Sequence, residues 1–169
     1  MPQRLNMLAR HHTRLAEIAE TAAHLVSRSV TKACMSDLRL LRIEMVDALG
    51  SYQSFVHHEV FEPAMKGSSA MERDIASALK VKCVELQGSY ERFRMRWSHR
   101  DARLNWPEYR LSAMQMVKHV RDHIHSTAAA EKIWADGTAP ADALSPENPN
   151  DRQSRYNQPK GESLITLSI

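Results

Sequence analysis

Apolar side chains recur at alternating three- and four-residue steps along four stretches of this chain, which is the spacing of one face of an α-helix. In the first stretch the apolar positions are Leu5, Leu8, Leu15, Ala19, Ala22 and Val26. Four helices that each carry one apolar face can bury those faces only against one another. The sequence therefore predicts an all-α fold, an antiparallel up-down four-helix bundle.

Helix boundaries follow from the breaks between these stretches. The first helix is expected over about Arg4 to Ser29, and the second from a cap at Ser36-Asp37 toward Met65, where Pro63 should kink or end it. The third begins near Ser69, and the fourth runs from Trp106 to about Trp134. After that point Gly, Pro, Asn, Asp and Ser dominate and the periodicity ends. We expect a bundle over residues 1–135 and a disordered tail over 136–169.

Composition narrows the classes of function. The chain has 169 residues and a formal charge of +3 from 23 basic and 20 acidic side chains, which gives no strong reason to expect a nucleic-acid partner. The only cysteines are Cys34 and Cys83, so we do not expect a disulfide framework. We expect the protein to reside in a reducing compartment. No apolar run approaches the roughly 20 residues that span a bilayer, and the first residues do not resemble a signal peptide. The sequence predicts a cytoplasmic protein without membrane association.

Histidine and glutamate interrupt the apolar stripes where a bundle interior should be dry. His12 fills the missing step of the first stripe, the second stripe leads into Glu59 and Glu62 with His58 beside them, and His123 continues the fourth. Burying such groups costs several kcal/mol unless something compensates them, and a bound metal is the commonest compensation. These five residues are the predicted metal ligands. The alternative is a metal-free core in which the imidazoles of His12 and His123 bond to the carboxylates of the second helix.

Two segments carry a family resemblance. Residues 52 to 65 read Tyr-Gln-Ser-Phe-Val-His-His-Glu-Val-Phe-Glu-Pro-Ala-Met, and residues 119 to 131 read His-Val-Arg-Asp-His-Ile-His-Ser-Thr-Ala-Ala-Ala-Glu. With the helix plan over about Leu5 to Ala135, they resemble the hemerythrin-like (HHE cation-binding) family. The resemblance implies a four-helix bundle that holds a non-haem di-iron centre and binds oxygen, senses oxygen or iron, or handles nitric oxide.

The family's ligands transfer to this sequence only in part. His12 matches the histidine of helix one, and His58 with Glu62 matches the His and Glu four residues apart on helix two, with Glu59 as a second carboxylate. An alignment anchored on Pro63 instead places Gln53 or Ser54 at the histidine position and His57 or His58 at the glutamate position.

The last two helices depart further from the family pattern. Cys83 stands where the third helix should offer a histidine. On the fourth helix His123 fits, but Thr127 stands where an acidic residue is expected, and Glu131 is the next carboxylate.

Two functions stay open on these grounds. The first is a non-haem iron protein that binds or senses oxygen, iron or nitric oxide, since five ligands from three helices suffice for one metal ion and are marginal for two. The second is a metal-free divergent bundle that acts as an adaptor or regulator through protein contacts. No nucleophile, base and orienting group occur together, so hydrolytic catalysis is not supported.

Overall fold

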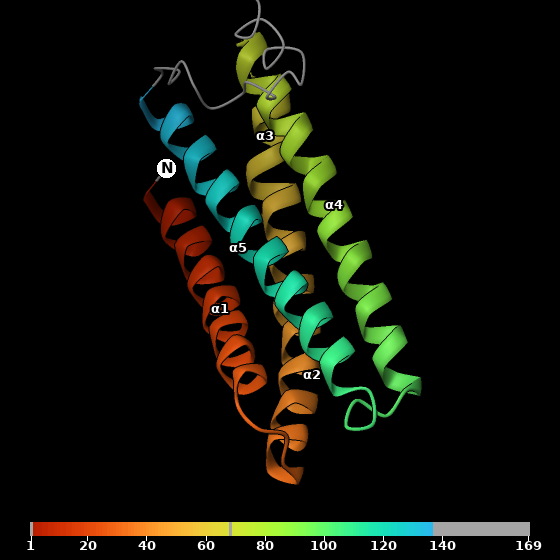
Figure 1. Cartoon of the computed structure of the whole chain (residues 1–169). Coiled ribbons are helices and arrows are strands. Elements are labelled where there is room, and N and C mark those ends of the chain that lie inside the picture. The colour runs from red at the N-terminus through yellow and green to blue at the C-terminus, as the bar shows by residue number, and fades with distance from the viewer. Residues whose placement is uncertain (1, 68, 137–169) are drawn as a thin grey trace, which may run out of the picture.

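The computed structural model describes residues 2–67 and 69–136, and this part of the chain is helical with short connections and no strand. Four long helical rods lie side by side (Figure 1). They are α1 (Pro2–Ser27), α2 (Lys32–Phe55) continued by η1 (Val56–Phe61) and α3 (Glu62–Met65), α4 (Ala70–His99), and α5 (Trp106–Asp136). The all-α prediction is confirmed. Of the tail predicted over 136–169, Asp136 is the last residue of α5, and residues 137–169 lie outside the described residues.

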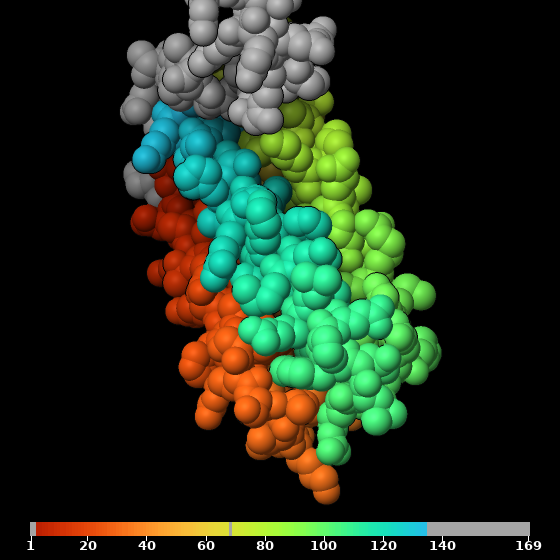
Figure 2. Space-filling model, viewed as in Figure 1, coloured from red at the N-terminus to blue at the C-terminus, as the bar shows by residue number. Residues whose placement is uncertain are grey.

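Each rod packs against two neighbours. Helix α1 contacts α2 and α5, α4 contacts α5, and the second rod meets α4 mainly through η1 and α3. The turn between α1 and α2 lies at the same end of the molecule as the loop between α4 and α5, whereas α3 and the last turns of α5 lie at the opposite end (Figure 1). Side chains of α1 and α4 close against either side of α5 (Figure 2). No described helix combines the length and apolar character needed to cross a membrane.

Hydroxyl caps set two helix starts. Thr31 Oγ1 accepts from the Cys34 amide at 3.1 Å, so α2 begins at Lys32, earlier than the predicted cap at Ser36-Asp37. Ser69 Oγ accepts from the Glu72 amide at 3.3 Å, which agrees with the predicted start of α4. Both caps satisfy amides that the first helical turn leaves without a backbone partner.

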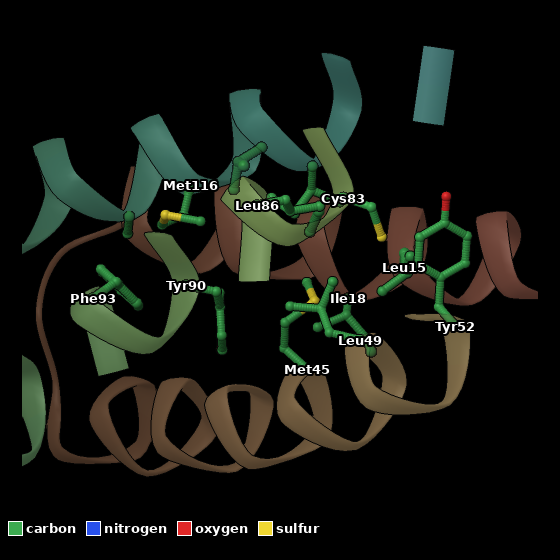
Figure 3. Packing of buried hydrophobic residues seen from close by; sticks show 14 of the residues in the cluster. Leu15, Ile18, Met45, Leu49, Tyr52, Cys83, Leu86, Tyr90, Phe93 and Met116 are labelled. Atoms are coloured by element: carbon green, nitrogen blue, oxygen red, sulfur yellow. The ribbon is translucent and has the colours of Figure 1, made fainter. Parts of the chain in front are cut away.

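One continuous core runs along the bundle. Figure 3 shows Leu15 and Ile18 of α1 facing Leu49 of α2 and Leu86 of α4, with Met116 of α5 further along the same interior. At the end formed by the α4–α5 loop the core is aromatic. There the Trp97 and Tyr109 rings meet edge to face with centroids 5.0 Å apart, and Trp97 Nε1 donates to Ser112 Oγ at 3.0 Å. This bond satisfies the polar group of an otherwise buried indole.

A π-helical turn, η1, changes which side chains of the second rod face the core. Its defining bond runs from the Glu62 amide to the His57 carbonyl, five residues back. The extra residue advances the helix by about 100° relative to an unbroken α-helix. The buried positions therefore pass from Tyr52 and Val56 to Val60 and Phe61, and the Glu59 that an unbroken helix would turn inward is exposed.

Pro63 and Arg4 fit this turn. Pro63 has no N–H to donate to the carbonyl of Glu59 four residues earlier. Arg4 Nη1 of α1 donates to that carbonyl at 3.0 Å. The π-turn is thus tied to the neighbouring helix at the point where its own backbone bonding is interrupted.

The rotation caused by the π-turn predicts that substitutions at positions 59 and 61 differ in their effect on the free energy of unfolding. Because Phe61 is fully buried, Phe61→Ala should lower the free energy of unfolding by about 3–5 kcal/mol. Glu59→Ala removes an exposed side chain and should change it by less than about 0.5 kcal/mol. Urea unfolding followed by circular dichroism measures both. A larger loss for Glu59→Ala than for Phe61→Ala would show that Glu59 faces the core.

Candidate functional site

The five predicted ligands do not converge. His12 and His123 are buried, with 9% and 5% of their surface exposed. His58 and Glu59 are exposed, and Glu62 is only half-buried. His58 Nδ1 lies 3.6 Å from Glu62 Oε1 on the surface of the second rod. The predicted convergence of His58, Glu59 and Glu62 with the buried histidines is wrong. His58 follows the exposed Ser54 by four residues and shares its outer face, and the π-turn rotates Glu59 outward.

A different set of polar side chains meets in the interior, and we call it the polar layer. Its members are His12 of α1, Tyr52 of α2, Cys83 of α4, and His123 and Thr127 of α5. All five are buried, and each long rod contributes at least one. Figure 3 shows the Cys83 sulfur and the Tyr52 ring on the same side of the core.

Hydrogen bonds link three members of the layer. Tyr52 Oη and His123 Nε2 are 2.8 Å apart, and Tyr52 Oη and Thr127 Oγ1 are 3.4 Å apart. Thr127 Oγ1 donates to the His123 carbonyl at 3.0 Å. Since the Thr127 hydroxyl gives its proton to that carbonyl, it accepts from Tyr52, and Tyr52 in turn accepts from the Nε2–H of His123. This direction of bonding assigns the Nε2–H tautomer to His123.

Helical spacing explains why these groups meet. Thr127 follows His123 by four residues and so lies on the same face of α5. His12 replaces one apolar step between Leu8 and Leu15 on α1. The Tyr52 ring lies between the two imidazoles, with ring centroids 5.6 Å from His12 and 5.6 Å from His123.

Burial keeps the layer uncharged at neutral pH. Burial, and then the charge of the neighbouring His11, lower the pKa of His12 to about 4. The pKa of His123 is also lowered to about 4, by burial and then by the charges of His12 and Lys82. Burial raises the pKa of the Tyr52 phenol and raises that of the Cys83 thiol to about 12. Both imidazoles, the phenol and the thiol are therefore neutral at pH 7.

Two imidazole nitrogens in the layer lack partners. His12 Nε2 and His123 Nδ1 are buried and accept or donate no hydrogen bond within the described residues. In the tautomer assigned above, His123 Nδ1 carries a free lone pair, which is the form of imidazole that binds metal ions. An unmade hydrogen bond at such a site costs about 1–3 kcal/mol.

The donor set does not fit a di-iron centre. Such a centre needs carboxylates that bridge the irons and offset their charge. The polar layer contains none, and on the same face of α5 the next carboxylate is the half-buried Glu131, one turn beyond Thr127. Among residues 2–67 and 69–136 no three His, Cys, Asp or Glu side chains are placed to hold one metal ion. Each rod still places a polar side chain at this level of the bundle, and Tyr52, His123 and Thr127 bond to one another.

A groove between α4 and α5 brings His123 near solvent. Its volume is about 270 Å³, and it is lined by Lys82, Glu85, Leu86, Ser89, His119, Asp122, His123 and Ser126. His119 and His123 are four residues apart on α5, a spacing that suits a metal ion on a helix surface, but His119 is exposed whereas His123 is buried.

Comparison with known proteins adds no assignment. The chain matches no protein-family model, no curated protein and no solved structure.

Two members of the layer had a weak signal in the sequence. Tyr52 lies on the apolar stripe, where a tyrosine is ordinarily read as a core ring. Thr127 stands where the family resemblance leads us to expect a carboxylate, and this alone does not predict a hydrogen bond to Tyr52. The phenol of Tyr52 on one helix can hydrogen-bond to the His-Thr pair, four residues apart, on another. Only the packing of the helices brings these groups within bonding distance.

The lowered pKa values of His12 and His123 predict a loss of stability in mild acid. In the unfolded chain both histidines take up protons near pH 6.5, whereas in the folded protein they do so near pH 4. The unfolded state therefore binds more protons between these values, and stability falls as pH drops from about 6.5 toward 4.

Thermal unfolding from pH 7 to pH 5 tests this, because carboxylates contribute little above pH 5. The melting temperature of a His12→Gln, His123→Gln protein should depend less on pH than that of the unmodified chain. A His58→Gln, His119→Gln control changes two exposed histidines and should keep the original pH dependence. Equal slopes in all three proteins would contradict the assignment.

Proposed function

We propose that this chain is a divergent hemerythrin-like protein, an antiparallel up-down four-helix bundle that acts as a regulator or adaptor through protein contacts. In it, a hydrogen-bonded layer stands where a di-iron centre would be. The proposal rests on the hydrogen bonds that run from His123 through Tyr52 to Thr127. On the helices where the resemblance implies metal ligands, these side chains bond to one another instead. The family assignment rests on the sequence resemblance.

The replacement is chemically consistent. A threonine hydroxyl cannot bridge two metal ions in place of a carboxylate, and a phenol that accepts from His123 engages the imidazole nitrogen it faces. The carboxylates that the sequence offered on the second rod, Glu59 and Glu62, lie outside the layer. Mutual bonding satisfies the Tyr52 and Thr127 hydroxyls and one nitrogen of His123 without a metal ion.

One end of the bundle has the character of a protein-binding surface. Residues 27–43 and 91–111, which form the turn between α1 and α2, the loop between α4 and α5 and the flanking helix ends, contain ten Lys or Arg and four Asp or Glu. We call this region the basic end. The net charge of the basic end is six positive charges, which is more than the +3 of the whole chain. The rest of the sequence is therefore net acidic.

Part of this charge and much exposed apolar surface are free for a partner. Arg96 and Arg100 pair with Glu108, but no acidic group among the described residues pairs with Arg39, Arg103 or Arg110. The most exposed large apolar side chains of this region are Leu40, Ile43, Met95, Leu104 and Leu111, from 55% to 84% exposed. Arginine with exposed apolar side chains is typical of protein interfaces, and the sign of the charge favours an acidic partner.

Metal analysis tests the loss of the iron centre. We expect untagged protein purified after iron loading to carry less than about one iron per ten chains and to show no oxo-iron absorption in air, since the layer lacks bridging carboxylates. Stoichiometric iron with such a spectrum would contradict the proposal.

Charge reversal tests the contact surface. A polyglutamate peptide should bind the protein at low salt and be released as salt rises, because its attraction is electrostatic. Arg39→Glu with Arg103→Glu should weaken binding at least several-fold in a calorimetric titration. Lys66→Glu, an exposed change of the same sign at the opposite end, is the matched control. Equal weakening by Lys66→Glu would show that net charge, and not the basic end, attracts the peptide.

A second candidate function is binding of a single first-row metal ion, and one observation favours it. The unpartnered nitrogens of His12 and His123 belong to imidazoles that stay neutral well below pH 6. Such a site would support the sensing of oxygen, iron or nitric oxide that the resemblance implies. A cobalt titration followed optically distinguishes it: His12→Gln with His123→Gln would abolish binding, whereas His58→Gln with Glu62→Gln would leave it intact.

A further inference from the structure

A pocket of about 240 Å³ lies at the end of the bundle opposite the basic end. Its walls come from the start of α1, from η1 and α3, from the start of α4 and from the last turns of α5. The lining residues are Arg4, Leu5, Leu8, Val60, Pro63, Ala64, Gly67, Glu72, Glu131 and Trp134. It is separate from the polar layer. The lining residues that come nearest to that layer along their helices are Leu8 and Glu131.

Most of the described pocket lining is apolar, and η1 contributes Val60 to it. In an unbroken helix the charged Glu59 would take the inward position, but η1 turns Val60 toward the interior, where it is 6% exposed. Leu8 is fully buried, and Leu5, Pro63 and Ala64 complete the apolar walls. A lining of this kind favours the aliphatic body of a ligand over several ordered waters.

Two polar atoms in the lining have no partner. Glu131 Oε1 and Trp134 Nε1 are buried, and neither makes a hydrogen bond within the described residues. Each unmade bond costs about 1–3 kcal/mol. The two side chains are three residues apart on α5, so they lie on neighbouring positions of one helix face. One atom only accepts and the other only donates, which specifies a ligand with a donor and an acceptor close together.

The charges around the pocket favour a cation. Its lining contains the carboxylates of Glu72 and Glu131 and the guanidinium of Arg4, which donates to the Glu59 carbonyl. Two acids against one base leave a net negative site. An ammonium group would offset the burial of the Glu131 carboxylate, and the indole of Trp134 offers a face that attracts cations.

We propose that this pocket binds small aliphatic amino alcohols, with the ammonium group donating to Glu131 Oε1 and the hydroxyl oxygen accepting from Trp134 Nε1–H. The aliphatic body of the ligand packs against Leu5, Leu8 and Val60. This assignment uses no residue of the polar layer or of the basic end, so it stands or falls separately from the proposed function.

Fluorine NMR of the full chain labelled with fluorotryptophan tests the proposal with leucinol as the probe. Trp134 lies in the pocket, whereas Trp97 and Trp106 lie at the opposite end and serve as internal references. Trp134→Phe assigns the pocket signal. Leucinol should shift that signal in a saturable way and leave the other two unmoved.

Matched compounds and variants define the contacts. Isohexanol lacks the ammonium group and isohexylamine lacks the hydroxyl, and each should bind at least about tenfold more weakly than leucinol. Glu131→Gln should weaken leucinol by a similar factor, with folding checked by circular dichroism. Glu17→Gln, an exposed change on the outside of α1, should leave its affinity unchanged.

Three results would overturn the assignment. An unmoved Trp134 signal up to millimolar leucinol would mean that water or another part of the chain satisfies the two polar atoms. Equal affinity for the three compounds would mean an apolar hole without polar recognition. Unchanged leucinol binding by a folded Glu131→Gln protein would remove the carboxylate from the site.

Discussion

The single π-turn at Val56–Phe61 decides what the interior of this bundle contains. One residue beyond the α-helical count rotates the end of the second rod by about 100°, and this rotation turns Glu59 outward and buries Phe61 beside Val60. The bond from Arg4 to the Glu59 carbonyl holds the same segment against α1. The character of both the polar layer and the end pocket follows from this one change of phase.

With the glutamates turned outward, the buried histidines depend on other partners. His123 bonds to a phenol and, through it, to the hydroxyl of Thr127 on its own helix. His12 stacks against the same phenol without a bond at Nε2. Low pKa values follow directly, because burial without a nearby carboxylate gives no compensation for imidazolium charge. The interior is thus a neutral network, in contrast to the charged ligand shell of an iron centre.

The two ends of the molecule differ in the way they can interact. The basic end presents positive charge and exposed apolar side chains on loops and helix ends, which suits a protein surface. The opposite end holds a pocket whose described lining is mostly apolar and net acidic, which suits a small cation. The layer lies between them and is close to solvent through the groove between α4 and α5.

The sequence alone determined the all-α class, the four apolar stripes and the burial of His12 and His123, because helical periodicity depends only on local spacing. It also predicted that the third helix begins near Ser69, where the structure shows a hydroxyl cap. It could not place His58, Glu59 and Glu62, since a π-turn depends on a balance between packing and one missing amide that periodicity does not encode. Only the tertiary structure brought Tyr52 to His123 across 71 positions of sequence and left Glu131 and Trp134 without partners in a pocket. Such pairings depend on the relative rotation of packed helices, a quantity that no single helix contains.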